Sequence, residues 1–260
     1  MTITVLIPSE AGRHAGALLS ARELSYVERF RSASRRHGAT AARVAAKWAL
    51  LRQLQPASVG EDDPSLLHWL GAGCLESADA SRFREVEVLP PDGRPGTAPR
   101  LSCRGRLLAC GYHVSMAHTH GLAGAMVGRS GPVGLDIEDA AADAPARALW
   151  TVKEALLKTG LTGARTLWEL LDLDVAPVVV PPADEGGTSR YLAVGPALRK
   201  GVGVLVTLTR CGGLLICGAV AAGPPRASPP YASCGGSPPY RTENRISLLP
   251  LNPSSQGHQP

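Results

Sequence analysis

Two short segments of the sequence carry carboxylates at spacings that could hold a divalent cation. The first, residues 132–138, reads PVGLDIE. In an extended strand, Asp136 and Glu138 would project from one face, because side chains alternate with a period of two. Two adjacent carboxylates repel each other, and Mg²⁺ would relieve that repulsion while keeping water and substrate phosphates as its other ligands. A strand that ends at an exposed turn near Asp139 gives the same pattern, so both interpretations stay open for this segment alone.

The second segment, residues 150–159, reads WTVKEALLKT and is expected to be a helix. Glu154 and Lys158 are four positions apart and therefore share a helix face. If this helix packs on the strand, Glu154 supplies a third carboxylate, and Lys158 supplies a cation within reach of a metal-bound phosphate. An ordinary surface ion pair has the same spacing and contributes little stability, so this segment is also ambiguous alone.

A third segment, residues 114–121, reads VSMAHTHG and places His118 and His120 on one side of an extended chain. Because Mg²⁺ prefers oxygen ligands to imidazole, we interpret a histidine here as a contact to a phosphate or a ribose. The Pro- and Gly-rich loop over residues 90–99 offers Arg94 as a further cation. A hydrogen-bonded structural histidine is the alternative.

Hydrophobic periodicity predicts the elements that would position these residues. Strands are expected over 2–7, 84–89, 132–138, 202–209 and 213–220, helices over 21–33, 39–54 and 150–159, and a strand or buried turn over 121–127. The segments KWALLR (residues 47–52) and KEALLK (residues 153–158) match at four positions, as a duplicated, two-lobed fold would leave behind. Ala and Leu are common in helices, so two unrelated helices can also share this many positions. Residues 223–260 are rich in Pro, Ser and Gly and are expected to form a disordered tail.

The composition narrows the class of protein. The chain has 260 residues, 44% of them apolar, which is enough for a packed core, and a net charge of +5 that suits an anionic partner or simply a solvated basic surface. Its six cysteines form no Cys-x-x-Cys pair, so neither a zinc site nor a disulfide framework is expected. Neither a leader sequence nor roughly 18 unbroken apolar residues is found, so we expect a cytoplasmic protein without a membrane span.

In their order and inner spacing, the segments MAHTHG, VGLDIED and WTVKEALLKTG resemble the signature segments of the 4′-phosphopantetheinyl transferase superfamily. The chain is similar in length to the larger surfactin-type members, and the resemblance covers residues 20–220. It implies an α+β monomer built as two similar lobes, each a small antiparallel sheet packed on helices. The N-terminal lobe would cover residues 1–130, and the C-terminal lobe, over 131–222, would carry the magnesium site. Coenzyme A would bind between the lobes. It also implies a Mg²⁺-dependent enzyme of the holo-[acyl-carrier-protein] synthase type, which primes carrier proteins of fatty acid synthesis or secondary metabolism.

The resemblance also assigns roles to individual residues. Asp136, Glu138 and Glu154 match the metal-binding acids, with Glu154 as the group that takes the proton of the attacking serine. Lys158 matches the lysine near the reacting phosphate, and Lys153 matches its companion.

Four further residues match positions that bind the nucleotide of coenzyme A. His118 matches the histidine that contacts the ribose phosphate. Arg94 matches the basic residue of a Gly-Lys/Arg-Pro loop, and Arg43 and Lys47 lie on the helix that supplies cations from the first lobe.

The sequence departs from the family pattern in two ways. The serine that precedes the histidine is Ala117 here, so Ser115 is a candidate replacement for the missing phosphate contact. The connection over residues 139–149 is shorter than in most members, where it carries a helix that helps to hold the carrier protein. An extended chain of this length still spans about 36 Å, so the strand and the helix can meet.

We therefore expect transfer of the phosphopantetheine arm of coenzyme A to a serine of an acyl or peptidyl carrier protein. A non-catalytic member that binds coenzyme A or accompanies a synthase is the first alternative. A different Mg²⁺-dependent phosphotransferase is less favoured because the sequence has no Gly-x-x-x-x-Gly-Lys-Ser/Thr loop. A nucleic-acid binder is also less favoured, since aromatic residues make up only 4% of the chain.

Overall fold

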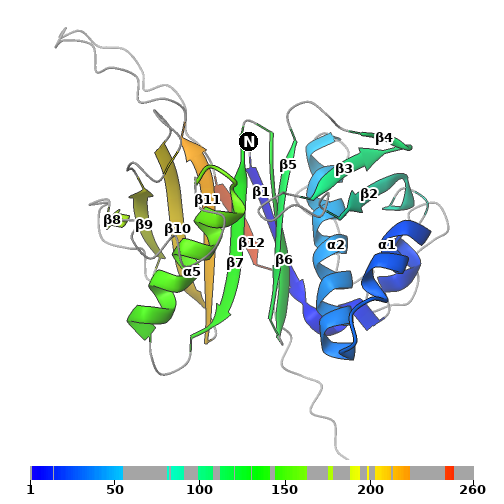
Figure 1. The fold of residues 1–260 in the computed structure, drawn as a ribbon, viewed down its shortest axis with the longest axis horizontal. Coiled ribbons are helices and arrows are strands. Elements are labelled where there is room, and N and C mark those ends of the chain that lie inside the picture. The colour runs from blue at the N-terminus through cyan, green and yellow to red at the C-terminus, as the bar shows by residue number, and fades with distance from the viewer. Residues whose placement is uncertain are drawn as a thin grey trace, which may run out of the picture.

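The predicted pattern of strands and helices corresponds to an α+β fold of small, mainly antiparallel sheets packed on helices, shown as a computed structural model in Figure 1. The structure describes residues 2–13, 15–54, 81, 83–90, 99–107, 112–119, 121–129, 131–140, 144–162, 175–177, 188–193, 198, 203–211, 213–222 and 244–248. Arg94 and His120, which the sequence singled out, lie outside these residues.

The first half of the chain, residues 2–129, contributes β1, β6 and β5 to a four-stranded sheet with the strand order β12-β1-β6-β5. The remaining strand, β12, is formed by Asn244–Leu248. Helix α2 contacts β1, β5 and β6 and covers one face of that sheet, while β2, β3 and β4 form a separate small sheet. The elements of this half are β1 (Thr2–Pro8), the 3-10 helices η1 (Ser9–Arg13) and η2 (Ala15–Leu18), α1 (Ala21–Val27), α2 (Ala33–Leu54), β2 (Val86–Leu89), β3 (Arg100–Cys103), β4 (Arg106–Leu107), β5 (His113–His118) and β6 (Leu122–Gly128).

The helix predicted over residues 21–33 is in fact the short helix α1 followed by the start of α2. Ser20 and Glu23 form a capping box at the start of α1, which satisfies backbone N–H groups of its first turn. A second start signal follows closely, because the Ser32 hydroxyl accepts a hydrogen bond from the Arg35 N–H at 3.5 Å. The chain therefore turns between two helices where hydrophobic periodicity alone predicted one.

The second half of the chain forms a five-stranded antiparallel sheet with the strand order β7-β11-β10-β9-β8. Helix α5 packs on β7, β10 and β11. The elements of this half are β7 (Val133–Asp139), α5 (Ala144–Lys158), β8 (Val175–Pro177), β9 (Thr188–Ala193), β10 (Gly203–Cys211) and β11 (Leu214–Ala222).

The two halves meet through the strands at the centre of Figure 1, where β7 lies beside β5 and β6. A shared apolar cluster fills the contact. Its members are Leu6, Ala117, Leu122 and Met126 from the first half and Val133, Leu135, Ile137 and Ile216 from the second. Burial of these side chains joins the halves and fixes the distance between residues that face one another across the contact.

Residues Asn244–Leu248 form strand β12, which pairs in parallel with β1 from Thr2↔Asn244 to Leu6↔Leu248. The prediction of a disordered tail over 223–260 is therefore wrong for these five residues, whose pairing with β1 no local pattern reveals. The other residues of that tail lie outside the part that the structure describes.

None of the described helices has the length and apolarity that crossing a membrane requires. The longest, α2, has 22 residues, and several of them are Arg or Lys.

Candidate metal centre and adjoining pocket

Strand β7 presents Asp136 and Glu138 on the face that α5 covers. It pairs with β11, and this register places Asp136 opposite Cys217 and Glu138 opposite Leu215. The alternate residues Leu135 and Ile137 point the other way and are buried in the cluster between the halves. The period-two pattern of the sequence thus corresponds to a strand with an apolar face toward the first half and a carboxylate face toward α5.

Helix α5 reaches these acids because it approaches β7 unusually closely at Gly134. A Cβ atom built on Gly134 would overlap the carbonyl group of Ala155. Only glycine leaves room for this contact, which brings the neighbouring Glu154 next to Asp136.

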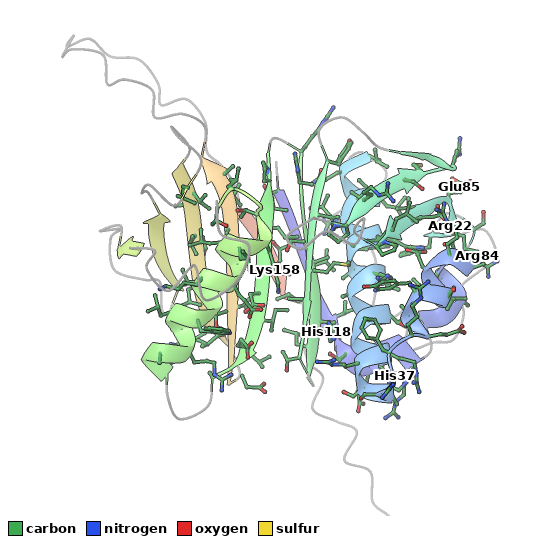
Figure 2. All side chains as sticks on the ribbon, in the orientation of Figure 1. Arg22, His37, Arg84, Glu85, His118 and Lys158 are labelled. Carbon is green, nitrogen blue, oxygen red and sulfur yellow. The ribbon has the colours of Figure 1, made fainter. Side chains whose placement is uncertain are left out.

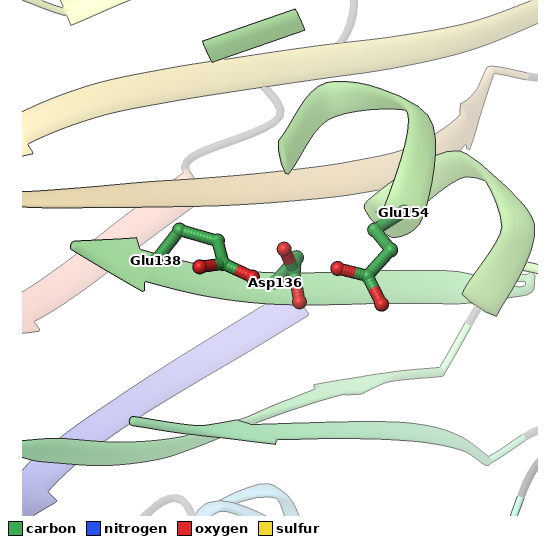
Figure 3. Close-up of side chains that lie close together, drawn as sticks. All are labelled: Asp136, Glu138 and Glu154. Atoms are coloured by element: carbon green, nitrogen blue, oxygen red, sulfur yellow. The ribbon is translucent and has the colours of Figure 1, made fainter. Parts of the chain in front are cut away.

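Asp136, Glu138 and Glu154 converge on one point, as Figure 3 shows. One carboxylate oxygen from each lies within 4.8 Å of the other two. Asp136 is only 3% exposed, and its Oδ2 is buried without a hydrogen-bond partner. A buried carboxylate oxygen that lacks a partner is costly, and a hard cation with oxygen ligands would satisfy it. The chemistry of the three residues therefore fits a hard divalent cation.

The electrostatics of this cluster favour a bound cation. Burial, reinforced by the charge of Asp136 and opposed by that of Lys158, raises the pKa of Glu154 to about 7. Burial and the charge of Asp136 also raise the pKa of Glu138, although Arg147 opposes the shift. Three carboxylates in one place therefore resist full ionisation, and a divalent ion would remove that resistance.

Two cations already contact the acids. Lys158 donates to Asp136 Oδ1 at 2.7 Å, and Arg147 Nη1 lies 3.3 Å from Glu138 Oε2. Both come from α5, as the order of the sequence motif predicts for Lys158. Lys153 is 5% exposed and immediately precedes Glu154, which places it about 100° around the helix from that acid.

A pocket of about 540 Å³ opens beside the acids, between the two halves. Its lining residues are Phe30, Ser34, Arg35, His118, Thr119, Ile137, Glu138 and Asp139. Glu138 is shared between the pocket and the acidic cluster, so a ligand in the pocket would lie next to a metal. Of these lining residues, Figure 2 labels His118, which belongs to the first half.

His118 extends from the end of β5 and is exposed at the pocket. Its ring lies against Gly38 of α2, where a Cβ atom would overlap it. The structure thus brings this predicted nucleotide contact to the same pocket as Glu138, from the opposite half of the molecule.

Lys47 lies away from the acids, and its predicted contact with a nucleotide is wrong. Its side chain is fully buried at 0% exposure, and its ammonium group pairs with Glu23 at 2.6 Å. The same ammonium donates to the carbonyl groups of Leu18 at 2.9 Å and Phe83 at 3.0 Å. All three of its N–H donors are therefore used inside the first half.

Arg43 is also directed into the core instead of toward a ligand, which corrects the second prediction for this helix. It is 4% exposed, stacks over the Tyr26 ring at 4.6 Å and donates to the carbonyl of Ala39. Burial lowers the pKa of its guanidinium. The local helical pattern could not predict this burial, because α2 is Ala-rich on several sides and offers no single polar face.

Ser115 likewise has a structural partner. Its hydroxyl accepts a hydrogen bond from the Leu135 N–H at 2.9 Å, in a buried position between the halves. It therefore does not replace the phosphate contact that Ala117 lacks.

No functional role was assigned from the sequence to four polar residues that line the pocket, namely Ser34, Arg35, Thr119 and Asp139. The basic run around Arg35 (RSASRRHG) was a usable signal for an anion-binding surface. The positions of Thr119 and Asp139 depend on how the halves meet, which no local pattern reveals.

No protein-family model matches the chain, and no curated protein is significantly similar to it.

Proposed function

We propose that this protein is a 4′-phosphopantetheinyl transferase that moves the phosphopantetheine arm of coenzyme A onto a serine of a carrier protein. The observation that carries the proposal is the convergence of Asp136, Glu138 and Glu154, with Lys158 among them, beside a pocket that also contains His118. Each sequence motif alone had an ordinary structural explanation. Their meeting at one place, from three separated segments, is what a shared chemical function would require.

The pocket supports an anionic substrate with an extended polar group. Arg35 and His118 line it on the side of the first half, and Glu138 lines it on the side of the second. We infer that the nucleotide of coenzyme A occupies this pocket, with its pyrophosphate directed toward the acids. Arg35 thereby takes the role that the resemblance assigned to Arg43 and Lys47.

We propose that the fold is the two-lobed arrangement of that superfamily. One helix packs on the sheet of each half, α2 on the first and α5 on the second, and the matching KWALLR and KEALLK segments lie on these two helices. This duplication supports the domain boundary near residue 130 and a single-chain, monomeric enzyme.

Asp136, Glu138 and Glu154 would hold Mg²⁺, which supplies charge neutralisation for the pyrophosphate when it is bound. The serine oxygen of the carrier forms a bond to the phosphorus that bears the pantetheine arm. The bond from that phosphorus to the bridging oxygen breaks, and adenosine 3′,5′-bisphosphate leaves. Glu154, which belongs to the acidic cluster, would accept the proton of the serine. Lys158 lies close enough to offset negative charge that develops on the phosphates.

A non-catalytic protein that binds coenzyme A is the second candidate function. Lys158 and Arg147 already pair with two of the acids, and Ala117 replaces a family serine. These ion pairs would compete with a metal. The proposed cytoplasmic location and carrier partner are common to both candidates.

The test is to incubate the purified protein with apo-carrier proteins of fatty acid, polyketide and nonribosomal peptide synthases, coenzyme A and Mg²⁺. We expect the carrier to gain the mass of the phosphopantetheine arm. The gain should disappear for Glu154→Gln and Asp136→Ala and persist for Glu10→Gln, an exposed acid of η1 that serves as a matched control. Coenzyme A binding without transfer to any carrier would instead favour the non-catalytic candidate.

A further inference from the structure

Strands β5 and β7 are edge strands of different sheets, and they lie beside each other where the halves meet. An edge strand presents backbone N–H groups that have no partner within its own sheet. Among the described strands, no backbone ladder joins β5 to β7. The connection is made by two hydroxyl groups instead.

One hydroxyl belongs to Ser115 on β5, and the other belongs to Thr119, the residue that follows β5. The Ser115 hydroxyl accepts a hydrogen bond from the Leu135 N–H of β7 at 2.9 Å. The Thr119 hydroxyl donates to Asp139 Oδ1, at the end of β7, at 3.3 Å. We call this pair of contacts the hydroxyl seam.

The seam fixes the alignment of the two strands. Its contacts join 115 to 135 and 119 to 139, so both strands advance in the same direction with a constant offset. Ala117 and Ile137, midway between the two contacts, lie in the shared apolar cluster. A slip of β5 against β7 would break both hydrogen bonds and disturb that packing together.

Thr119 is itself firmly held by the first half. Its N–H donates to the Leu122 carbonyl at 2.7 Å, and its own carbonyl accepts from the Ser9 hydroxyl at 2.8 Å. Its side-chain hydroxyl is therefore a fixed point from which the first half reaches the second. Thr119 and Asp139 both line the pocket, directly next to His118 and Glu138 in the chain.

We propose that Thr119 is a positioning residue: its hydroxyl, with that of Ser115, sets His118 against Glu138 across the pocket. The proposal deepens the proposed function, because the ligand that needs this alignment is coenzyme A. The metal site does not depend on the seam, since all three of its acids lie on β7 and α5. Loss of the seam should therefore weaken nucleotide binding and spare metal binding.

The test compares Thr119→Val, which keeps the shape and removes the hydroxyl, with Thr119→Ser, which keeps the hydroxyl. We expect Thr119→Val to raise the Kd and KM for coenzyme A about three- to tenfold, the effect of one lost hydrogen bond. We expect kcat and the Mg²⁺ affinity measured without coenzyme A to change less than about twofold. Thr119→Ser should restore coenzyme A binding.

Ser102→Ala is a matched control, because it removes a hydroxyl-to-carboxylate hydrogen bond of 3.0 Å to Glu87 in a different sheet. It should leave the affinity for coenzyme A unchanged. Equal coenzyme A affinity in wild type and Thr119→Val would overturn the positioning role.

Hydrogen–deuterium exchange separates this inference from the proposed function. Thr119→Val should speed exchange at the end of β7 in the absence of any ligand, and Thr119→Ser should not. If the wild type binds no coenzyme A, the proposed function fails and exchange alone decides whether the seam aligns the strands. Identical exchange in wild type and Thr119→Val would then overturn the inference.

Discussion

Replacing Glu154 by Gln should stabilise the metal-free protein at alkaline pH. The wild-type carboxyl group has its pKa raised from 4.5 to about 7 in the folded chain, first by burial and then by Asp136. The folded state therefore holds this proton more tightly than the unfolded state. As a result, the wild type loses stability as the pH rises from about 4.5 to about 7, and the loss is complete above that range. Gln does not ionise in this pH range, so the Glu154→Gln variant keeps its stability.

The pKa shift sets the size of the effect. Fully converted, it corresponds to at most about 3 kcal/mol in the free energy of unfolding. Because Glu154 is only partly buried, solvent screening reduces the expected difference to about 1–2 kcal/mol. At pH 8.5 with a chelator, the Glu154→Gln variant should thus exceed the wild type by that amount, and at pH 4.5 the two should be nearly equal.

Urea denaturation with and without Mg²⁺ measures the free energy of unfolding of both proteins in the metal-free and metal-bound states. Addition of Mg²⁺ should raise the free energy of unfolding of the wild type and have little effect on Glu154→Gln, since one ligand is weakened. Glu10→Gln, on the exposed surface of η1, controls for the loss of one negative charge. A Glu154→Gln variant that is less stable than the wild type at pH 8.5 would refute the crowding of carboxylates on which the metal site depends.

Three other predictions concern the supports of the site. Lys47→Met should lower the free energy of unfolding, measured in urea, by about 3–5 kcal/mol, because it leaves the Glu23 carboxylate buried without its cation. A cost below about 1 kcal/mol would contradict this. Gly134→Ala should push α5 away from β7 and lower the free energy of unfolding by about 1–3 kcal/mol. It should also lower the Mg²⁺ affinity measured by calorimetry, and an unchanged affinity would contradict the close approach of α5 to β7. Truncation after Ala222 removes β12 and should lower the Tm in calorimetry, because β1 then becomes an edge strand; an unchanged Tm would argue against the pairing.

Much of the metal centre could be predicted from the sequence because it depends on local periodicity. A strand period of two places Asp136 and Glu138 together, and a helix period places Glu154 with Lys158. Only the meeting of the two elements required the fold. Gly134 marks that meeting point in the sequence, although its meaning is clear only when the Ala155 carbonyl is seen beside it.

The residues that line the pocket were harder to predict, because their positions depend on partners distant in the chain. Lys47 resembles a surface cation until Glu23 and two carbonyl groups are placed around it. Arg35 also lies on α2, and it received no role from the sequence. It lines the pocket, whereas Arg43 and Lys47 of the same helix do not. The strand β12 was missed for the same reason, since its pairing with β1 is fully non-local.

The central claim is that three acids hold a divalent ion against the pyrophosphate of coenzyme A. A crystal structure with Mn²⁺ and coenzyme A tests it most directly, because Mn²⁺ can be located by its anomalous scattering. We expect one ion about 2.1 Å from an oxygen of each of Asp136, Glu138 and Glu154, with pyrophosphate oxygens as further ligands and the adenosine beside His118. An ion elsewhere, or coenzyme A outside the pocket between the halves, would contradict it.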